Sequence, residues 1–514
     1  MLNVQEVKQA ISAIPYIKSV TYQEEDKVLV CGKIEVELDG LEKPLEFEFK
    51  IHPQYPLKSY HSESIKFFNK KMLEYSHVMI DGSICIHTSY KTNIPEKIRD
   101  DFSSLRHWIE KYYLNHEKDK KYEHILVRPQ AINNKYYFYL FTNIDYEFKC
   151  GEYGEMELSH LNESSRESVI DVTYIVQKFL LDENNKVECD WNQSCKHYPE
   201  RTIGFFIFIE QPPAKYNKFV FQDFEHLEAF IPHPFLEKLF QFEQENIKHH
   251  KGKLIPIFIG YYTAKPKIHW QVLMLEIGKF PIITDGYAEK NGLLLPLRKI
   301  KKQTINWAVT HNASYENVFG RGTLDRKITN SKILIIGIGA IGSTLAKALV
   351  KGGCRYIAIA DYELKEPGNV CRSEYSFHTG ITEKVFELEQ ILLQNSPFVE
   401  IAIFEKKAFD EMIKMLYTHS EIIEGYRQRL NEFDIIFDCT TDNDLMYVLD
   451  SLQLSCDLIN LSITNYAKDL VCAFAPNIYH FVNTQFESIL ENRTDDLYEP
   501  FGCGILHSKP RILT

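Results

Sequence analysis

The sequence of 514 residues lacks the features that place a protein in a membrane or along a nucleic acid. It contains no run of about eighteen apolar residues, and no basic segment followed by an apolar one opens the chain, so neither a membrane span nor a secretory leader is expected. It also lacks a run of lysines and arginines, and its net charge is −12. These absences argue against a surface that tracks nucleic acid. We therefore expect a cytoplasmic protein that binds neither membrane nor nucleic acid.

Paired cysteines are also missing. The eleven cysteines are irregularly spaced and odd in number, which predicts reduced thiols in a cytosolic protein. No Cys-x-x-Cys pair occurs, although a structural zinc site needs that short spacing. Cys189, Cys195 and His197 form the one cluster, and its loose spacing favours a surface loop over a metal site. Zinc is not expected.

The length predicts two or three domains, and no internal repeat or low-complexity segment is present. We place boundaries after residue 122 and after residue 305. The predicted fold class is a multidomain α+β and α/β protein. It comprises an α+β domain (1–122), a joining α/β domain (123–305) and a C-terminal Rossmann-like α/β domain (306–514).

A predicted strand, a glycine-rich turn and a predicted helix begin the C-terminal domain. Gly337 permits a tight turn, Gly339 lets a phosphate approach the backbone, and Gly342 lets helix and strand pack closely. Asp361 follows the next predicted strand, 356–360, where a carboxylate can hydrogen-bond a ribose. Alone, this pattern fits an NAD(P) enzyme.

The residues that follow favour a different ligand. Asn369 and Arg372 come soon after the ribose carboxylate, and Lys384 lies on the next predicted helix. A further predicted strand leads into Asp438-Cys-Thr-Thr-Asp442. Two cations and a carboxylate at strand ends suit a triphosphate with Mg²⁺. This indicates adenylation, in which a carboxylate attacks the α-phosphate of ATP and pyrophosphate leaves.

Residues 306–476 resemble the ATP-binding domain of the ubiquitin-activating and sulfur-carrier-activating (ThiF/MoeB-like) family. The resemblance implies a nucleotide cradle and a ribose ligand, formed by Gly337, Gly339, Gly342 and Asp361. It implies phosphate ligands at Asn369, Arg372 and Lys384, with Arg321 or Arg326 as the arginine that the family uses against the phosphates. It places Mg²⁺ on Asp442, but this chain has one threonine more than the family's Asp-x-Thr/Ser-Asp, so Asp438 is a rival. Such domains are commonly homodimers, and a homodimer is expected here.

The first hundred residues carry a second set of motifs. A predicted helix (4–14) and three predicted strands precede Pro53-Gln-Tyr-Pro56, and Asp81-Gly-Ser-Ile-Cys85 follows. This order resembles a ubiquitin-conjugating enzyme core, which has a Pro-x-Tyr-Pro loop and then a Gly-x-Ile-Cys segment. The resemblance implies that Cys85 is a nucleophile that carries acyl groups as thioesters. A buried structural thiol is the alternative reading of the Ile-Cys-Ile context.

His77 departs from the conjugating-enzyme pattern, which usually has an asparagine eight residues before the cysteine. The asparagine is thought to order the loop or to support an oxyanion, and an imidazole could donate the same hydrogen bond. Alternatively, His77 is a loop residue that packs against Tyr75.

The two motif sets in this order resemble bacterial fusions of the cyclic-oligonucleotide antiphage systems (CBASS). The resemblance implies that ATP and Mg²⁺ activate the C-terminal tail of a nucleotide-cyclase-like or ubiquitin-like protein. The acyl group then passes to Cys503, in Phe-Gly-Cys-Gly, and on to Cys85, where a target lysine or a small amine attacks it. Cys503 could also be a tail residue without a role.

Two other functions stay open. One is carboxylate adenylation for sulfur transfer or peptide modification, in which the N-terminal domain only binds the partner. The other is a non-enzymatic scaffold, which the presence of Arg372 and Lys384 disfavours.

The middle of the chain has no residue set that indicates catalysis. Four runs rich in aromatic and β-branched residues predict buried strands, at 136–142, 203–209, 254–260 and 269–275. Residues 224–244 show helical spacing interrupted by prolines, which predicts two helices. We expect this part to join the other two domains.

Overall fold

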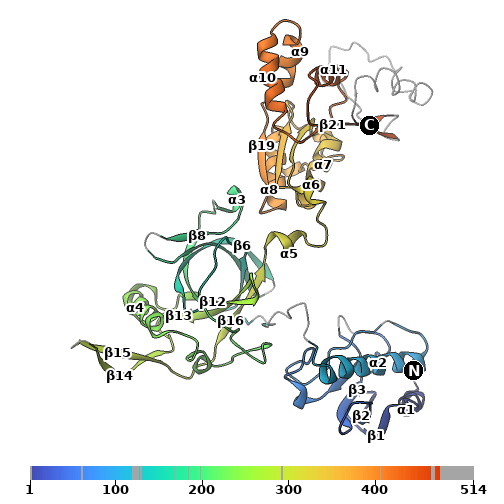
Figure 1. Cartoon of the computed structure of the whole chain (residues 1–514), viewed down its shortest axis with the longest axis vertical. Coiled ribbons are helices and arrows are strands. Elements are labelled where there is room, and N and C mark those ends of the chain that lie inside the picture. Colours follow the sequence, from blue (N-terminus) through green and yellow to red (C-terminus); the bar gives the residue numbers. More distant parts are fainter. Residues whose placement is uncertain are drawn as a thin grey trace.

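The computed structural model of the chain describes residues 3–474, apart from 59–61, 89, 118–126, 128–129, 167, 183–184, 197, 291–292, 406 and 465–468. Figure 1 shows a C-terminal sheet with its helices at one end of the long axis, a ring of strands in the middle and an N-terminal α+β unit towards the other end. Within these described residues, no helix combines the length and the apolar character that a membrane crossing needs.

The N-terminal unit is an antiparallel meander covered by helices. Its elements are α1 (Val4–Ser12), β1 (Ile17–Gln23), β2 (Val30–Val36), β3 (Leu45–Ile51), β4 (Ile65–Phe68), η1 (Lys70–Met72), α2 (Ile94–Trp108) and the π-helical turn η2 (Ile109–Leu114). The predicted first helix and three strands are confirmed within two or three residues at each end. Asn93 caps α2 by accepting a hydrogen bond from the Glu96 amide at 3.0 Å.

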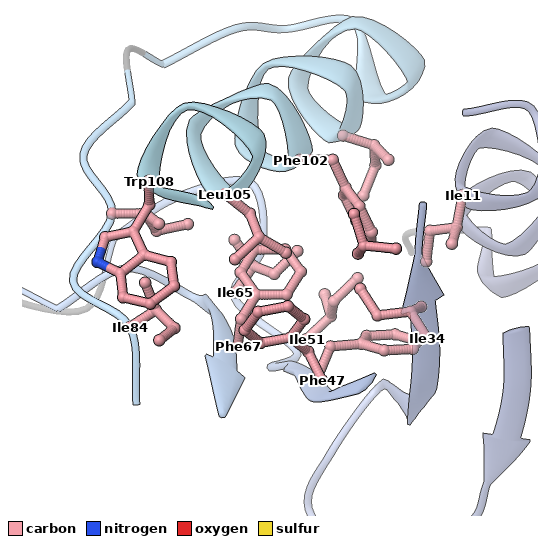
Figure 2. Close-up of a cluster of buried hydrophobic side chains, with 14 of the residues drawn as sticks. Ile11, Ile34, Phe47, Ile51, Ile65, Phe67, Ile84, Phe102, Leu105 and Trp108 are labelled. Atoms are coloured by element: carbon pink, nitrogen blue, oxygen red, sulfur yellow. The ribbon is translucent and has the colours of Figure 1, made fainter. Parts of the chain in front are cut away.

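Helices and sheet of this unit meet in one apolar core. Side chains of β3 point alternately into the core and outward. Phe47, Phe49 and Ile51 are therefore fully buried, and the residues between them face outward. Figure 2 shows side chains of the sheet, among them Phe47 and Phe67, beneath Phe102 and Leu105 of α2. The same core contains Ile84, next to Cys85, so the segment that carries the cysteine is anchored in it.

The middle of the chain forms a closed β-barrel. Its strands are β5 (Lys135–Phe141), β6 (Tyr153–Arg166), β7 (Val169–Leu180), β9 (Arg201–Phe208), β12 (Leu254–Ala264), β13 (Lys267–Glu276) and β16 (Asn306–Asn312), with β8 (Lys186–Glu188) beside β7. Parallel pairing of β5 with both β16 and β7 closes the ring that Figure 1 shows end-on. The four predicted strands are confirmed as β5, β9, β12 and β13.

Alternating side chains divide the barrel into an inside and an outside. Along β9, Phe206 and Phe208 belong to the interior cluster, whereas Phe205 and Ile207 belong to the outer one. The outer cluster lies beneath η3 (Phe224–Leu227) and α4 (His233–His250), which are the two predicted helices, the first of them a 3₁₀ turn. The remaining elements are α3 (Gln193–Lys196) and two hairpins, β10 (Ala214–Lys215) with β11 (Phe219–Val220) and β14 (Ile282–Lys290) with β15 (Leu293–Ile300).

β16 begins at Asn306 and pairs with β13 and β5 of the barrel. Residues 306–312, which the sequence assigned to the C-terminal domain, therefore belong to the sheet of the middle unit, and the division into domains stays a prediction. The barrel also contacts the C-terminal unit directly. Asn192 donates its side-chain amide to the Ser396 carbonyl at 2.8 Å, and the Trp191 ring stacks on the Phe398 ring with centroids 5.9 Å apart.

The C-terminal unit is a doubly wound sheet with strand order β19-β18-β17-β20-β21-β22. Its strands are β17 (Lys332–Ile336), β18 (Tyr356–Ala360), β19 (Glu400–Ile403), β20 (Ile435–Asp438), β21 (Asp457–Thr464) and the antiparallel β22 (Asp469–Phe474). Its helices and turns are α5 (Tyr315–Phe319), α6 (Arg326–Thr329), α7 (Ala340–Lys351), η4 (Pro367–Asn369), η5 (Phe377–Thr379), α8 (Lys384–Asn395), α9 (Ala408–Met415), α10 (Ser420–Leu430) and α11 (Asn443–Ser451).

Both faces of this sheet are covered. Ile333 and Ile335 of β17 pack with α7 and α8, whereas Leu334 and Ile336 pack in the cluster that contains α9, α10 and α11. A strand buried on both faces must be apolar throughout, which explains the continuous Ile-Leu-Ile-Ile run. The predicted Rossmann-like α/β fold of the C-terminal region is confirmed.

Candidate active sites

A cavity of about 550 Å³ opens where β17, β18 and β20 end. Ile336, Ala360 and Asp438 are the last residues of these strands and are paired across the sheet, so the turns that follow them share one edge. The chain order reverses between β17 and β20, and ligands of doubly wound sheets bind at such a point. Five residues predicted from the sequence line the cavity, namely Gly337, Gly339, Asp361, Lys384 and Asp442.

The three glycines differ in what surrounds them. Gly337 has φ +78°, which favours glycine, and an added Cβ would lie 2.8 Å from the Thr440 methyl. A Cβ on Gly342 would lie 2.0 Å from the Gly337 carbonyl oxygen, so only a hydrogen lets α7 pack this closely on the turn. A Cβ on Gly339 would meet nothing within 4 Å. Gly339 thus leaves open space at the N-terminus of α7, whose amides and dipole attract anions.

Asp361 and Lys384 lie side by side in the cavity wall and are nearly buried. The carboxylate of Asp361 accepts hydrogen bonds from the amides of Ile338 (3.0 Å) and Glu363 (2.8 Å). The Lys384 ammonium is 2.5 Å from a Glu363 carboxylate oxygen and 3.9 Å from Asp361. Burial raises the pKa of Asp361, and the Lys384 charge opposes that shift. The Lys384 ammonium can bind phosphate oxygens if the half-exposed side chain of Glu363 moves away from it.

Of the two rival metal ligands, only Asp442 lines the cavity. Asp438 is 1% exposed, and its carboxylate accepts hydrogen bonds from Thr440 (backbone 3.0 Å, hydroxyl 2.6 Å) and from the Asn460 side chain (3.0 Å). Burial raises the pKa of Asp438. The extra threonine, Thr441, takes a left-handed conformation with φ +58°, and Asp442 then caps α11. Asp438 therefore holds the turn, and Asp442 faces the cavity.

Four predicted phosphate ligands do not line the cavity. The side-chain oxygen of Asn369 accepts a hydrogen bond from the Glu366 amide at 2.7 Å, which caps η4. Arg372 is exposed beyond that turn. Arg321 and Arg326 are exposed near α5 and α6. Their roles as nucleotide ligands stay predictions.

The sequence reasoning missed a further part of the cavity lining. Lys407, Phe409 and Ile413 contribute it, from the N-cap and the body of α9, which follows β19. Lys407 adds an exposed cation, and Phe409 adds an aromatic face. The signal was available, because β19 is the next parallel strand and its carboxyl end must reach the same edge of the sheet.

The predicted nucleophile Cys85 lies on the N-terminal unit and is half-buried. Its amide donates to the His77 carbonyl at 2.8 Å, while the flanking Ile84 and Ile86 are each 4% exposed. Its sulfur is 3.3 Å from Nε2 of His87, a residue that the sequence analysis did not consider. The buried-thiol alternative does not fit this position.

His77 adopts φ +59°, and its ring lies against Tyr112 of η2 with centroids 4.9 Å apart. Its ring thus packs against Tyr112. The loop around it is held from two sides. The Trp108 indole donates to the Ser76 carbonyl at 2.9 Å, and Lys218, between β10 and β11, donates to the carbonyls of residues 75 and 78 at 2.5 Å and 3.2 Å.

A buried polar network fixes the chain just after Cys85. Lys97 and Asp101 of α2 form an ion pair with side chains 2% and 0% exposed. Thr88 donates its hydroxyl to Asp101 and accepts from Lys97 at 2.6 Å, and the Tyr55 hydroxyl donates to Asp101 at 2.8 Å. Since a buried ion pair needs every partner satisfied, this network ties the Tyr-Pro loop and the cysteine segment to α2.

Among the other cysteines of the described residues, Cys150, Cys371 and Cys472 are exposed. Burial raises the pKa of the thiols of Cys189, Cys195, Cys354, Cys439 and Cys456, which makes them poor nucleophiles. Cys503 lies outside the described residues, as does His197 of the loose cysteine cluster. No group of three or more metal-binding side chains was found in the described part of the chain.

The strand order, the glycine turn and the cavity define a Rossmann-like nucleotide-binding domain. Residues 312–467 match the ThiF family and form a ThiF family domain in the C-terminal region. The chain is 27% identical over 195 residues to the ATP-dependent ubiquitin transferase-like protein Cap2 of Enterobacter hormaechei, covering 37% of this chain and 30% of that protein. It is 28% identical over 139 residues to the adenylyltransferase and sulfurtransferase MOCS3 of Drosophila sechellia, covering 26% of each.

The chain therefore spans less than a third of the length of either relative. Among solved structures, the E. coli protein MccB with ATP matches at 17% identity over 27% of this chain and 39% of that one, with a TM-score of 0.23. E. coli tRNA N6-threonylcarbamoyladenosine dehydratase, TcdA, with AMP matches at 16% identity over 28% and 55%, with a TM-score of 0.23.

Proposed function

We propose that the protein adenylates the C-terminal carboxylate of a partner protein with ATP and transfers the acyl group, through cysteine thioesters, to a target amine. The ThiF family domain and its adenylyltransferase relatives support the first step. The Cap2 similarity and the half-buried position of Cys85 support the transfer steps, and the Cap2 similarity supports a role in antiphage defence of the CBASS type.

The observation that carries the proposal is the cavity at the strand ends. It combines an open helix N-terminus at Gly339, a ribose-type carboxylate at Asp361 and cations at Lys384 and Lys407. Its volume, about 550 Å³, suits a nucleotide with part of a peptide tail. A site for an NAD(P) pyrophosphate needs little positive charge, because helix amides suffice. Two lysines in the cavity lining therefore favour a triphosphate.

Each residue has a distinct task in this proposal. The backbone around Gly337 and Gly339 cradles phosphates, and Asp361 binds ribose hydroxyls. Lys384 and Lys407 neutralise the charge that grows on the α-phosphate and on pyrophosphate as the carboxylate attacks. Asp442 would hold Mg²⁺, which supplies further neutralisation of phosphate charge. Asn369, Arg372 and Arg326 lie outside this cavity, so we assign them to the partner tail, to pyrophosphate or to the other protomer of a homodimer.

In the next steps, the partner's acyl-adenylate meets a thiol. A thiolate attacks the carbonyl carbon, a thioester forms and AMP leaves. We assign this first thiol to Cys503 and the final carrier to Cys85, with His77 in the position of the conjugating-enzyme asparagine. A lysine of a target protein, or a small amine, then attacks the Cys85 thioester.

ATP–pyrophosphate exchange tests the adenylation step. With a tail peptide whose terminal carboxylate is free, the chain should exchange labelled pyrophosphate into ATP, and an amidated peptide should not support exchange. Lys384→Met should reduce exchange at least about 100-fold, since it removes a buried cation next to the reacting phosphate. Lys327→Met, at an exposed lysine of α6, serves as the matched control. Exchange that is unaffected by Lys384→Met would contradict the proposed site.

A second function shares the adenylation step. The similarity to an adenylyltransferase and sulfurtransferase favours transfer of sulfur to the activated carboxylate, with the N-terminal unit only binding the partner. Cys85→Ala separates the two proposals. Loss of amide-linked products with exchange preserved supports conjugation, whereas unchanged product formation supports sulfur transfer.

A further inference from the structure

The thiol of Cys85 has an imidazole within hydrogen-bonding distance. Nε2 of His87 lies 3.3 Å from the Cys85 sulfur, and the His87 side chain is exposed. The two residues are separated by one position in an extended segment, in which Ile84 and Ile86 point into the core. Because side chains alternate along an extended chain, Cys85 and His87 share the outward face.

The backbone on both sides of the pair is fixed. Before it, the amide of Ile84 donates to the Phe67 carbonyl and that of Cys85 donates to the His77 carbonyl, both at 2.8 Å. After these two residues, the Thr88 hydroxyl hydrogen-bonds to the buried ion pair of Lys97 and Asp101 on α2. The inward isoleucines and the anchored threonine leave the segment no freedom to slip by one residue, which would turn both Cys85 and His87 from the outward face into the core. The contact is thus a consequence of the fold rather than of two mobile side chains.

We propose that His87 is a further catalytic residue of the thiol site, acting as the proton acceptor and donor for Cys85. This inference rests on the proposed function, in which Cys85 carries the acyl group.

The proton balance closes over one cycle. When the acyl group arrives, Nε2 takes the proton of the Cys85 thiol, the sulfur attacks the carbonyl carbon, and the carbon–sulfur bond forms as the bond to the leaving thiolate or AMP breaks. When an amine attacks, the carbon–nitrogen bond forms, the carbon–sulfur bond breaks, and the imidazolium returns its proton to the Cys85 thiolate. The surplus proton of the amine goes to solvent. Positioned proton transfer of this kind commonly accelerates a step by a factor of about 10² or more.

Alkylation of the full-length chain by iodoacetamide, followed by mass spectrometry of each cysteine peptide, tests the pair without ATP or a partner. Cys85 should react about tenfold faster than Cys150, which is exposed, because the His87 imidazole can take the thiol proton as the sulfur attacks the reagent. His87→Gln keeps a side chain of similar polarity and should bring Cys85 down to the rate of Cys150. His107→Gln, at an exposed histidine of α2, is the matched control and should change nothing.

Equal rates for Cys85 in the wild type and in His87→Gln, at an unchanged urea midpoint, would overturn the inference. A second readout is the rate at which Cys85 acquires its acyl group in a single turnover, which should fall about tenfold or more in His87→Gln while pyrophosphate exchange is preserved. If the proposed function is wrong and this inference is right, the result is different. Cys85 would then react with iodoacetamide in a His87-dependent way, but it would never form an adduct with ATP and a tail.

Discussion

We expect substitution by alanine to have opposite effects at Gly339 and Gly342, the two glycines at the start of α7. In Gly342→Ala, the new methyl would lie 2.0 Å from the Gly337 carbonyl oxygen, and real Cβ atoms come no closer than about 3.0 Å, so the helix must move about 1 Å from the turn. In Gly339→Ala, the methyl would enter open space and meet no atom within 4 Å. If that space receives a phosphate, the methyl blocks the nucleotide without disturbing the fold.

The magnitudes follow from these surroundings. Overpacking against backbone costs up to about 3 kcal/mol, and the better helix propensity of alanine returns about 1 kcal/mol, so Gly342→Ala should destabilise the chain by about 2 kcal/mol. Gly339→Ala, at the N-cap, should cost at most about 1 kcal/mol of stability. It should weaken ATP binding at least about tenfold, or about 1.4 kcal/mol.

Urea unfolding and calorimetric titration with ATP measure both effects on the same samples. Wild-type affinity for ATP in Gly339→Ala would refute the placement of the phosphates over the open N-terminus of α7. Wild-type stability in Gly342→Ala would refute the close packing between helix and turn.

Three further predictions concern residues outside that turn. Lys218→Met removes the hydrogen bonds that hold the loop near Cys85, so amide hydrogen exchange at Cys85 should be faster by mass spectrometry, and unchanged protection there would contradict the contact. Glu363→Gln frees Lys384 and should tighten ATP binding about threefold by calorimetry. The gain is modest because Glu363 is half-exposed. Weaker binding would show that the Lys384–Glu363 ion pair assists nucleotide binding. Burial raises the pKa of Asp438 above 3.8, so its contribution to stability is complete below that pH and is lost as pH rises through the folded-state value. In urea unfolding, the stability of Asp438→Asn relative to wild type should therefore rise as pH increases above about 4, and a flat difference would contradict the raised pKa of this buried carboxyl group.

Local patterns predicted most of the C-terminal unit. The Ile-Leu-Ile-Ile run could only be a strand buried on two faces, and Gly337 and Asp361 had to meet because parallel strands end at one edge. Lys407 follows β19 and therefore also lies at this edge of the sheet, yet it was missed because no motif marks it. Asn369 is the opposite case, because a motif pointed to it as a phosphate ligand but its side chain caps a turn.

Closure of the barrel could not be predicted from periodicity. Alternation identified β5 and its neighbours as strands, but the pairing of β5 with β7 joins residues far apart in sequence, and no local pattern encodes it. The Cys85–His87 contact was readable in principle, because residues two apart on an extended chain share a face. It was overlooked because the family motif ends at the cysteine. The role of Cys503 stays a prediction.

Mass spectrometry of the chain, incubated with ATP, Mg²⁺ and a tail peptide, tests the central claim most directly. The account predicts a thiol-reducible adduct on the Cys85 peptide that forms in the wild type and is absent from Lys384→Met and Cys85→Ala. Turnover of ATP to AMP and pyrophosphate without any adduct on Cys85 would contradict it.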